Sequence, residues 1–187
     1  MHIDPQLLKA CVKQDRKAQN LLYKQCFGVL MGVCIRYYRQ EEEAASVLNL
    51  GFLKILQNLD KRKAKVPFEA WIRRIMINTI IDEYRKNKRH QQKIRYEDLQ
   101  EPHLQASKVD FNEADRQFDA AELEALIRRL PPVSREVFNL FAIDGYTHKE
   151  ISDMLGISKG TSKWHVSFAR KQLKGWLSEK MTNLITK

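Results

Sequence analysis

The 187-residue sequence predicts an all-α protein, built as two small helical domains joined by an acidic linker. Apolar residues recur at spacings of three and four along most of the chain, as amphipathic helices require, and no stretch sustains the alternation of a strand. Only seven glycines and five prolines interrupt these segments. Residues 91–119 lack this period and are rich in Gln, Asp and Glu, which indicates that they connect two helical blocks.

The N-terminal domain is expected to span residues 1–92 and to contain four helices. Their predicted bounds are about 5–15, 18–39, 41–59 and 68–90. The third helix is apolar over more than one face, since Leu48, Phe52, Ile55 and Leu59 form one stripe and Val47, Leu50 and Leu53 form a second row. Such a helix is either wholly buried or gives one face to a partner, and periodicity alone leaves both interpretations open.

A strongly basic segment follows the third helix. Residues 61–95 carry 12 Lys or Arg against 3 Asp or Glu, within a chain of net charge +10. Basic side chains next to aromatic rings suit single-stranded nucleic acid, because the charges meet phosphates and the rings stack on unpaired bases. Trp71 lies at the start of the helix beside the basic loop, and the alternative interpretation is that it is a core anchor. The basic residues of the loop and of the helix end are Lys61, Arg62, Lys63, Lys65, Arg85, Lys86, Lys88 and Arg89.

After the linker, predicted at 93–119, residues 120–187 are expected to form a four-helix domain. Its helices are predicted at about 121–130, 134–143, 147–155 and 158–178. Thr147 and Glu150 have the spacing of a capping box at a helix start, and Gly156 stands where that helix must end. A helix, a turn containing glycine and a second helix are typical of a helix-turn-helix.

The sequence GISKG around Ser158 also fits the pattern of a hydrolase nucleophile. That pattern needs a strand before the serine, and the residues before Ser158 are predicted to be helical. Ser158 is therefore expected to cap the last helix rather than to act as a nucleophile. No other set of acid, base, nucleophile or metal ligands is visible, so the sequence does not indicate an enzyme, a metal or a cofactor.

The last helix has two distinct faces. Ser162, Val166, Ala169 and Leu173 share one arc and should face the core. The opposite arc carries Trp164, Phe168 and several cations, which suits duplex DNA; a partner-protein surface at the two rings stays open. The residues expected to meet duplex DNA are Ser158, Lys159, Thr161, Lys163, Trp164, Ser167 and Lys171.

Two other features suggest where the protein works. There is no 18-residue apolar run, and MHIDPQLLKACVK does not have the layout of a signal peptide. The three cysteines, Cys11, Cys26 and Cys34, lack C-x-x-C spacing and are expected to be reduced and partly buried. A cytoplasmic protein is therefore expected.

Three segments of the chain are informative when taken together: LYKQCFGVLMGVCIRYY, FEAWIRRIMINTIIDEYRKNKR and RRLPPVSREVFNLFAIDGYTHKEISDMLGISKGTSKWHVSFARKQL. They resemble the extracytoplasmic-function group of bacterial sigma factors, in the sigma-70 family. Their order is the family's order, and the resemblance extends over nearly the whole chain. The most specific matches are at Trp71, Asn78, Asp82, Leu130-Pro131, Arg135-Glu136 and Glu150-Ile151.

This resemblance implies a transcription initiation factor that joins RNA polymerase core and directs it to promoters. The first domain would dock on core through Ala45, Ser46, Asn49, Leu50 and Leu53. The second domain would read the upstream (−35) element as duplex, while the linker would run through the polymerase. An anti-sigma factor would be a further partner. The residues implied at the opened downstream (−10) strand are Lys61, Arg62, Lys63, Lys65, Trp71, Asn78, Arg85, Lys86 and Arg89.

The sequence departs from the family pattern at both interfaces. Ala45, Ser46 and Asn49 replace an acidic pair and a glutamine, which makes the polymerase contact less polar. Trp164 and Phe168 replace a small polar residue and an arginine, so they either alter promoter preference or belong to a protein interface. The alternative function is a helix-turn-helix regulator that does not join polymerase, but residues 1–90 lack the strand–helix alternation of a receiver domain.

Overall fold

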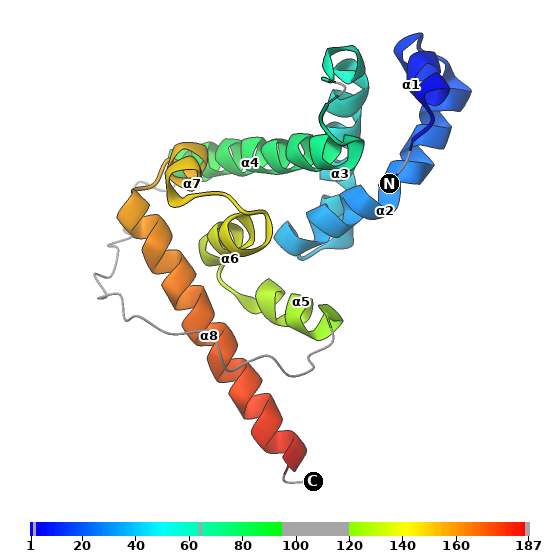
Figure 1. Ribbon diagram of the computed structural model, residues 1–187. Helices are drawn as coiled ribbons and strands as arrows, with labels where there is room; N and C mark the ends of the chain where they lie inside the picture. The colour runs from blue at the N-terminus through cyan, green and yellow to red at the C-terminus, as the bar shows by residue number, and fades with distance from the viewer. Residues whose placement is uncertain (2, 64, 95–119, 186–187) are drawn as a thin grey trace. The chain divides into compact units, whose positions relative to one another are not determined.

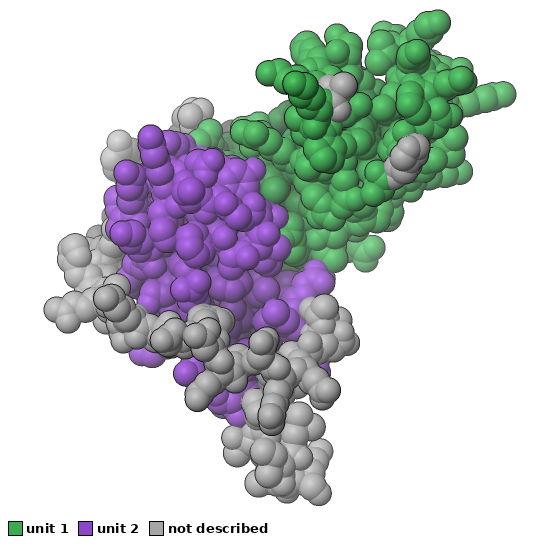
Figure 2. All heavy atoms as spheres, viewed as in Figure 1, with its two compact units in different colours: residues 1–96 green, residues 97–187 purple. Residues whose placement is uncertain are grey.

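The computed structural model describes residues 1, 3–63, 65–94 and 120–185, although the side chains of 88–94, 120–121 and 180–185 lie outside the description (Figure 1). These residues are helical, with turns and loops between the helices, and contain no strand. The chain divides into two compact units, Met1–Tyr96 and Glu97–Lys187 (Figure 2). The prediction of an all-α protein with two helical domains is confirmed. Most of the predicted linker, from residue 95 to 119, lies outside the described residues.

The described residues of unit 1 form four α-helices and one short 3₁₀ turn. They are α1 (Pro5–Val12), α2 (Arg16–Tyr37), α3 (Glu41–Gln57), η1 (Leu59–Lys61) and α4 (Phe68–Ile94). The predicted first helix was three residues too long, because Gln14 turns the chain with a positive φ of 62° and Asp15 caps α2. The fourth helix continues four residues past its predicted end, into the start of the expected linker.

Helices α2, α3 and α4 pack against one another and enclose the core of unit 1. The largest of its fully buried side chains include Leu22, Leu30, Leu48, Ile55, Ile72 and Met76. Gly51 faces Met76 across the α3–α4 contact, and a Cβ on it would lie 2.5 Å from Met76 Cε and 2.7 Å from Sδ. The glycine in the middle of α3 therefore has a packing reason, since a larger residue would displace a buried side chain.

The structure resolves the two interpretations of α3. Its first stripe, from Leu48 to Leu59, is buried, and so is Val47. Leu50 and Leu53 of the second row are 42% and 52% exposed. One face of α3 belongs to the core and a second face is free in this unit.

Unit 2 contains α5 (Ala120–Arg129), α6 (Pro132–Phe138), the π-helical turn η2 (Asn139–Ile143), α7 (His148–Leu155) and α8 (Lys159–Ile185). The segment predicted as one helix at 134–143 is thus α6 followed by a π turn, and it begins at a proline, which suits a first helical turn. Helix α8 runs seven residues past its predicted end. The core cluster consists of Leu126, Ile127, Leu130, Phe138, Ala169 and Leu173, with Trp176 and Leu177 packed against it.

The local predictions for the helix-turn-helix are confirmed. Thr147 and Glu150 form the reciprocal capping box at the start of α7. Gly156 ends α7 in the left-handed region, at φ 65° and ψ 38°. Ser158 Oγ accepts the backbone N–H of Thr161 at 2.9 Å, so it caps α8. A helix, not a strand, precedes Ser158, which removes the context that a hydrolase nucleophile needs.

Two glycines of unit 2 should respond to alanine in opposite directions. Gly156→Ala places a Cβ on a left-handed residue and should lower the free energy of unfolding of unit 2 by about 1–2 kcal/mol. Gly175→Ala, in the open middle of α8, has no neighbour within 4 Å and should raise it by roughly 1 kcal/mol through helix propensity. Urea unfolding followed by circular dichroism measures both; changes of the same sign would contradict this account of the turn.

Candidate nucleic-acid and polymerase interfaces

An open hollow of about 360 Å³ lies on unit 1 where α3, η1 and α4 meet. It is lined by Lys54, Asn58, Lys61, Trp71, Ile75, Asn78, Thr79 and Asp82. Three residues that the sequence analysis assigned to an opened DNA strand, namely Lys61, Trp71 and Asn78, are therefore brought together. The hollow has two lysine ammonium groups, one carboxylate, two amides, a hydroxyl and an aromatic ring on its wall. These are groups that can stack on a base and hydrogen-bond its edges.

Trp71 is half-buried and combines the two roles considered for it. Its ring packs on the buried Phe68 with the ring centroids 5.8 Å apart and the planes tilted by 42°. The remaining part of the ring lines the hollow. Trp71 is thus held by the core on one side and available to a planar ligand on the other.

A pair of opposite charges joins the two long helices at this hollow. Lys54 Nζ on α3 lies 2.9 Å from Asp82 Oδ2 on α4. Both side chains are about half exposed, so the pair adds little stability by itself, but it fixes where the two charges stand. Sequence reasoning did not identify Lys54, because it lies 28 positions from Asp82 and the contact follows only from the packing of α3 on α4.

Asn58 was also missed, and it organises the edge of the hollow. Its side-chain amide donates to the backbone carbonyl of Lys54 at 2.8 Å. Its Oδ1 accepts from Lys61 Nζ at 3.4 Å. An asparagine at a helix end was the available signal, since asparagine often hydrogen-bonds nearby backbone there.

The basic residues of the loop differ in how far their side chains are engaged by the protein itself. Arg62 Nη1 donates to the carbonyl of Val66 at 2.8 Å, and the guanidinium lies 5.7 Å from the centroid of the Phe68 ring. Arg62 therefore braces the loop, whereas Lys61, Lys63 and Lys65 are exposed.

The basic residues at the end of α4 are described only in part. Arg85 and Lys86 are exposed, and Lys86 Nζ is 3.9 Å from Glu83 one turn away. Arg89 lies in the helix, but its side chain and that of Lys88 fall outside the description.

The free face of α3 continues onto α2. Ser46, Asn49, Leu50 and Leu53 are exposed and Ala45 is half-buried. Tyr23 Oη donates to Asn49 Oδ1 at 3.0 Å, and its ring packs edge-on against Phe52 with a centroid separation of 5.0 Å. Phe27 extends this contact from Tyr23 and is 40% exposed.

We call this surface the α2–α3 face. Its residues are Tyr23, Phe27, Ala45, Ser46, Asn49, Leu50 and Leu53. The sequence analysis missed the two aromatic residues from α2, because only the fold brings them beside α3. Three large apolar side chains exposed on a single face favour a protein partner over solvent.

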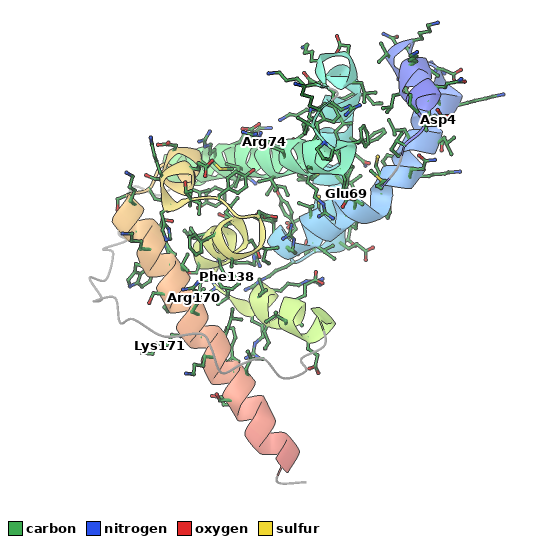
Figure 3. The ribbon with its side chains drawn as sticks, in the orientation of Figure 1. Asp4, Glu69, Arg74, Phe138, Arg170 and Lys171 are labelled. Carbon is green, nitrogen blue, oxygen red and sulfur yellow. The ribbon has the colours of Figure 1, made fainter. Side chains whose placement is uncertain are left out.

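On unit 2, α8 has the two faces that its sequence predicts. Ser162, Val166, Ala169 and Leu173 are buried. On the other side Ser158, Lys159, Lys163 and Lys171 are exposed, and Thr161, Trp164 and Ser167 are half-buried. Figure 3 shows Lys171 on α8 beside Arg170.

His148, which the sequence analysis did not single out, connects three elements of the helix-turn-helix. Its Nδ1 lies 2.9 Å from Ser162 Oγ on α8, and its ring stacks on Phe141 of η2 at 4.4 Å. Burial, and then the nearby charges of Lys163 and Arg170, lower its pKa, which favours the neutral imidazole. A neutral ring can stack and hydrogen-bond without adding a charge next to the core.

The three cysteines are all free and buried. Burial raises the pKa of the Cys26 and Cys34 thiols to about 12. Burial and then the Asp15 carboxylate also raise the pKa of Cys11. Within the described residues no three His, Cys, Asp or Glu side chains are placed to share a metal ion.

Comparison with known proteins identifies matches in both units. Residues 22–90 match the model of sigma-70 region 2, and residues 120–173 match that of sigma-70 region 4. In the part of the chain that the structure describes, none of the helices has the length and apolar character needed to cross a bilayer.

Curated relatives extend this similarity along the chain. This chain is 28% identical over 142 residues to the ECF RNA polymerase sigma factor SigE of Mycolicibacterium smegmatis, and the match covers 74% of this chain and 53% of SigE. The chain is 29% identical over 133 residues to RNA polymerase sigma factor SigZ of Bacillus subtilis, and the match covers 68% of this chain and 69% of SigZ. It is 23% identical over 176 residues to the RNA polymerase sigma-H factor of Pseudomonas aeruginosa, covering 91% of each.

A similar solved structure is the sigma factor RpoE in complex with the anti-sigma factor NepR, from Bartonella quintana. The TM-score is 0.49, with 19% identity over 84% of this chain and 96% of that chain.

The buried cysteines should resist alkylation in the folded protein. At about pH 8 a thiol whose pKa is about 12 has on the order of a thousandfold less thiolate than an ordinary cysteine, and thiolate is the reacting form. We expect iodoacetamide to leave Cys26 and Cys34 unmodified until the protein is unfolded in urea, when both react. Mass spectrometry of the labelled peptides measures this, and rapid native labelling at either site would contradict the packing described here.

Proposed function

The chain belongs to the extracytoplasmic-function group of the sigma-70 family, and we propose that it binds RNA polymerase core, directs it to specific promoters and helps to open them. The observation that carries this proposal is the order of the two matched regions along one chain: region 2 at residues 22–90 and region 4 at residues 120–173. A regulator that only reads duplex DNA would need a helix-turn-helix unit but no region 2. The domains proposed are residues 1–92, a linker at 93–119 and residues 120–187.

Core polymerase is proposed to bind the α2–α3 face. This face exposes Phe27, Leu50 and Leu53 on helices whose other sides are fixed in the core. Apolar side chains on a rigid helix pair can be buried by a partner with little loss of conformational freedom. Because Ala45, Ser46 and Asn49 carry no charge, this contact should depend on apolar burial more than on ion pairs.

The hollow on unit 1 is proposed to hold a base from the opened non-template strand. Trp71 offers a ring for stacking, and Asn78, Asn58 and Lys54 offer groups for the edges of the base. The exposed lysines of the basic loop and Arg85, Lys86 and Arg89 are proposed to meet the phosphates on either side. Capture of an unpaired base stabilises the open strand and so favours promoter melting.

Unit 2 is proposed to read the upstream element as duplex. The start of α8 would enter the major groove, with Lys159, Lys163 and Lys171 near phosphates or base edges. Ser158 and Thr161 hold the first turn of α8, since their side-chain oxygens lie 2.8 Å apart. Ser158 can act in positioning even where it makes no contact with DNA.

In this proposal the protein is not an enzyme and needs no cofactor, because polymerase performs the chemistry. It would act in the cytoplasm, where polymerase and promoter DNA are found. The acidic residues of the linker would run along a polymerase channel that accommodates nucleic acid. An anti-sigma factor that covers the α2–α3 face would compete with core polymerase and keep the protein inactive.

A charge placed on the α2–α3 face should block assembly with core polymerase. Leu50→Asp and Leu53→Asp each force a carboxylate into an apolar contact, so we expect at least a tenfold loss of affinity for core, or about 1.4 kcal/mol. Both residues are exposed, so circular dichroism should be unchanged. Fluorescence anisotropy of the labelled protein titrated with core measures the affinity.

The matched control for this experiment is Leu123→Asp on α5 of unit 2, where the leucine is 39% exposed, close to the 42% of Leu50. It should bind core as the wild type does. If the wild-type protein has no affinity for core polymerase, the proposed function fails and the duplex-reading regulator becomes the better account.

Removal of the loop lysines should impair opening more than duplex binding. We expect the Lys61→Ala, Lys63→Ala and Lys65→Ala triple variant to lower the permanganate reactivity of promoter thymines in the holoenzyme complex. If all three lysines contact phosphates, the log–log salt dependence of single-strand binding should fall by about 2 units, at about 0.7 per phosphate contact. Arg62 is left in place because it braces the loop.

A control for net charge replaces Lys13, Lys17 and Lys24, which are exposed and lie outside the loop and the hollow. That variant loses the same charge and should open promoters normally. An equal loss of duplex footprint and permanganate signal in the loop variant would assign the loop to duplex binding or folding instead of strand capture.

A further inference from the structure

The outer side of α8 carries two aromatic rings that form a single surface. Trp164 and Phe168 lie one turn apart, and their rings stack with centroids 5.2 Å apart and planes only 19° from parallel. The His165 ring meets Trp164 edge-on at 4.8 Å. Both stacked rings are half-buried, so each keeps part of its surface in solvent. We call this surface the aromatic stack.

The charges around the aromatic stack favour a polyanionic partner. From Lys159 to Ser178 the sequence contains five Lys or Arg and no Asp or Glu. Lys163 and Lys171 are exposed beside the stack, while the opposite side of α8 is the buried core of unit 2. A strip of two rings edged by cations complements a DNA groove, where phosphates line both edges and bases lie between them.

The chemistry of the rings then restricts what they can read. Phe168 has no hydrogen-bonding group, and Trp164 has one N–H donor. A phenylalanine covering the oxygen of guanine or the amino group of cytosine would remove those groups from water without replacing their hydrogen bonds. The C5-methyl group of thymine is the only apolar group that a base pair presents in the major groove, so the stack favours thymine.

The spacing of the two rings can be compared with that of base pairs. The ring centroids lie 5.2 Å apart. Base pairs follow one another at about 3.4 Å along a strand. Successive base pairs are also rotated about the duplex axis, so groups on their edges lie farther apart than this rise, and the two rings can reach neighbouring base pairs.

We propose that the Trp164–Phe168 stack is a specificity determinant that reads two successive thymine methyl groups in the upstream duplex element. This inference rests on the proposed function, in which unit 2 meets duplex DNA. Loss of one contacted methyl should weaken binding about fourfold, the equivalent of about 0.8 kcal/mol for one buried carbon.

The test uses the full chain assembled with core polymerase. Duplexes with a randomised upstream segment are selected for binding, and the best sequence is resynthesised with deoxyuridine in place of each thymine in turn. Deoxyuridine keeps the hydrogen-bonding edge of thymine and removes only its methyl group. We expect selection of adjacent thymines and an approximately fourfold loss of affinity at each of these two positions, or about 16-fold when both are replaced.

Two variants assign the effect to the rings. The Trp164→Ser and Phe168→Ser double variant should bind thymine and deoxyuridine duplexes equally. Lys171→Ala should bind all duplexes more weakly while keeping the preference for thymine. Circular dichroism of both variants checks that α8 remains folded.

The outcomes separate this inference from the proposed function. Specific binding without any effect of the methyl groups overturns the inference, leaves the proposed function intact and makes the stack a protein contact. A methyl effect that persists in the double variant overturns it as well. Failure of the assembled complex to select any duplex sequence overturns both.

Discussion

The close contact between α3 and α4 determines what unit 1 can do. A Cβ on Gly51 would overlap the buried Met76 side chain, so the glycine leaves the room that Met76 occupies between the two helices. Because that side of α3 is used in the core, Leu50 and Leu53 are left on a free side next to Asn49. At the end of the same contact, Lys54 reaches Asp82 and the hollow with Trp71 forms beside them. One helix thus contributes both to the face proposed to bind core polymerase and to the hollow proposed to hold an unpaired base.

Unit 2 depends on a different arrangement, in which one long helix is fixed by short ones. Ser162 and His148 are hydrogen-bonded at 2.9 Å, and Ser134 and His165 are joined at the same distance. Arg129 stacks on Trp176 at 4.5 Å further along α8. These contacts hold one side of α8 firmly, so its outer side is presented as a fixed pattern of lysines and rings, which sequence-specific binding requires.

Local features were the part of this structure that sequence could predict. The capping box at Thr147, the left-handed Gly156 and the capping Ser158 follow from interactions within a few residues, and all three are present. The ends of helices were less predictable, since α4 and α8 both run beyond the expected residue. The π turn after α6 also had no sequence signal that we recognised.

The parts of the site that sequence missed are those made by distant residues. Lys54 and Asn58 join the hollow, and Phe27 joins the α2–α3 face, only because three helices pack together. The distinct role of Arg62 within the basic loop depends on the position of Phe68 and Val66. Charge and periodicity indicated the kind of ligand to expect, whereas the packing shows which side chains line the hollow and the α2–α3 face.

The central claim is that this protein gives RNA polymerase core both a promoter preference and the ability to open the DNA. The most direct test is transcription in vitro by core polymerase from a pool of linear templates with a randomised upstream region, followed by sequencing of the RNA 5′ ends. Our account predicts transcripts that depend on this protein, begin at a fixed position and come from templates sharing two sequence elements at a constant spacing. Transcripts that are the same with and without the protein, although it binds DNA, would contradict it.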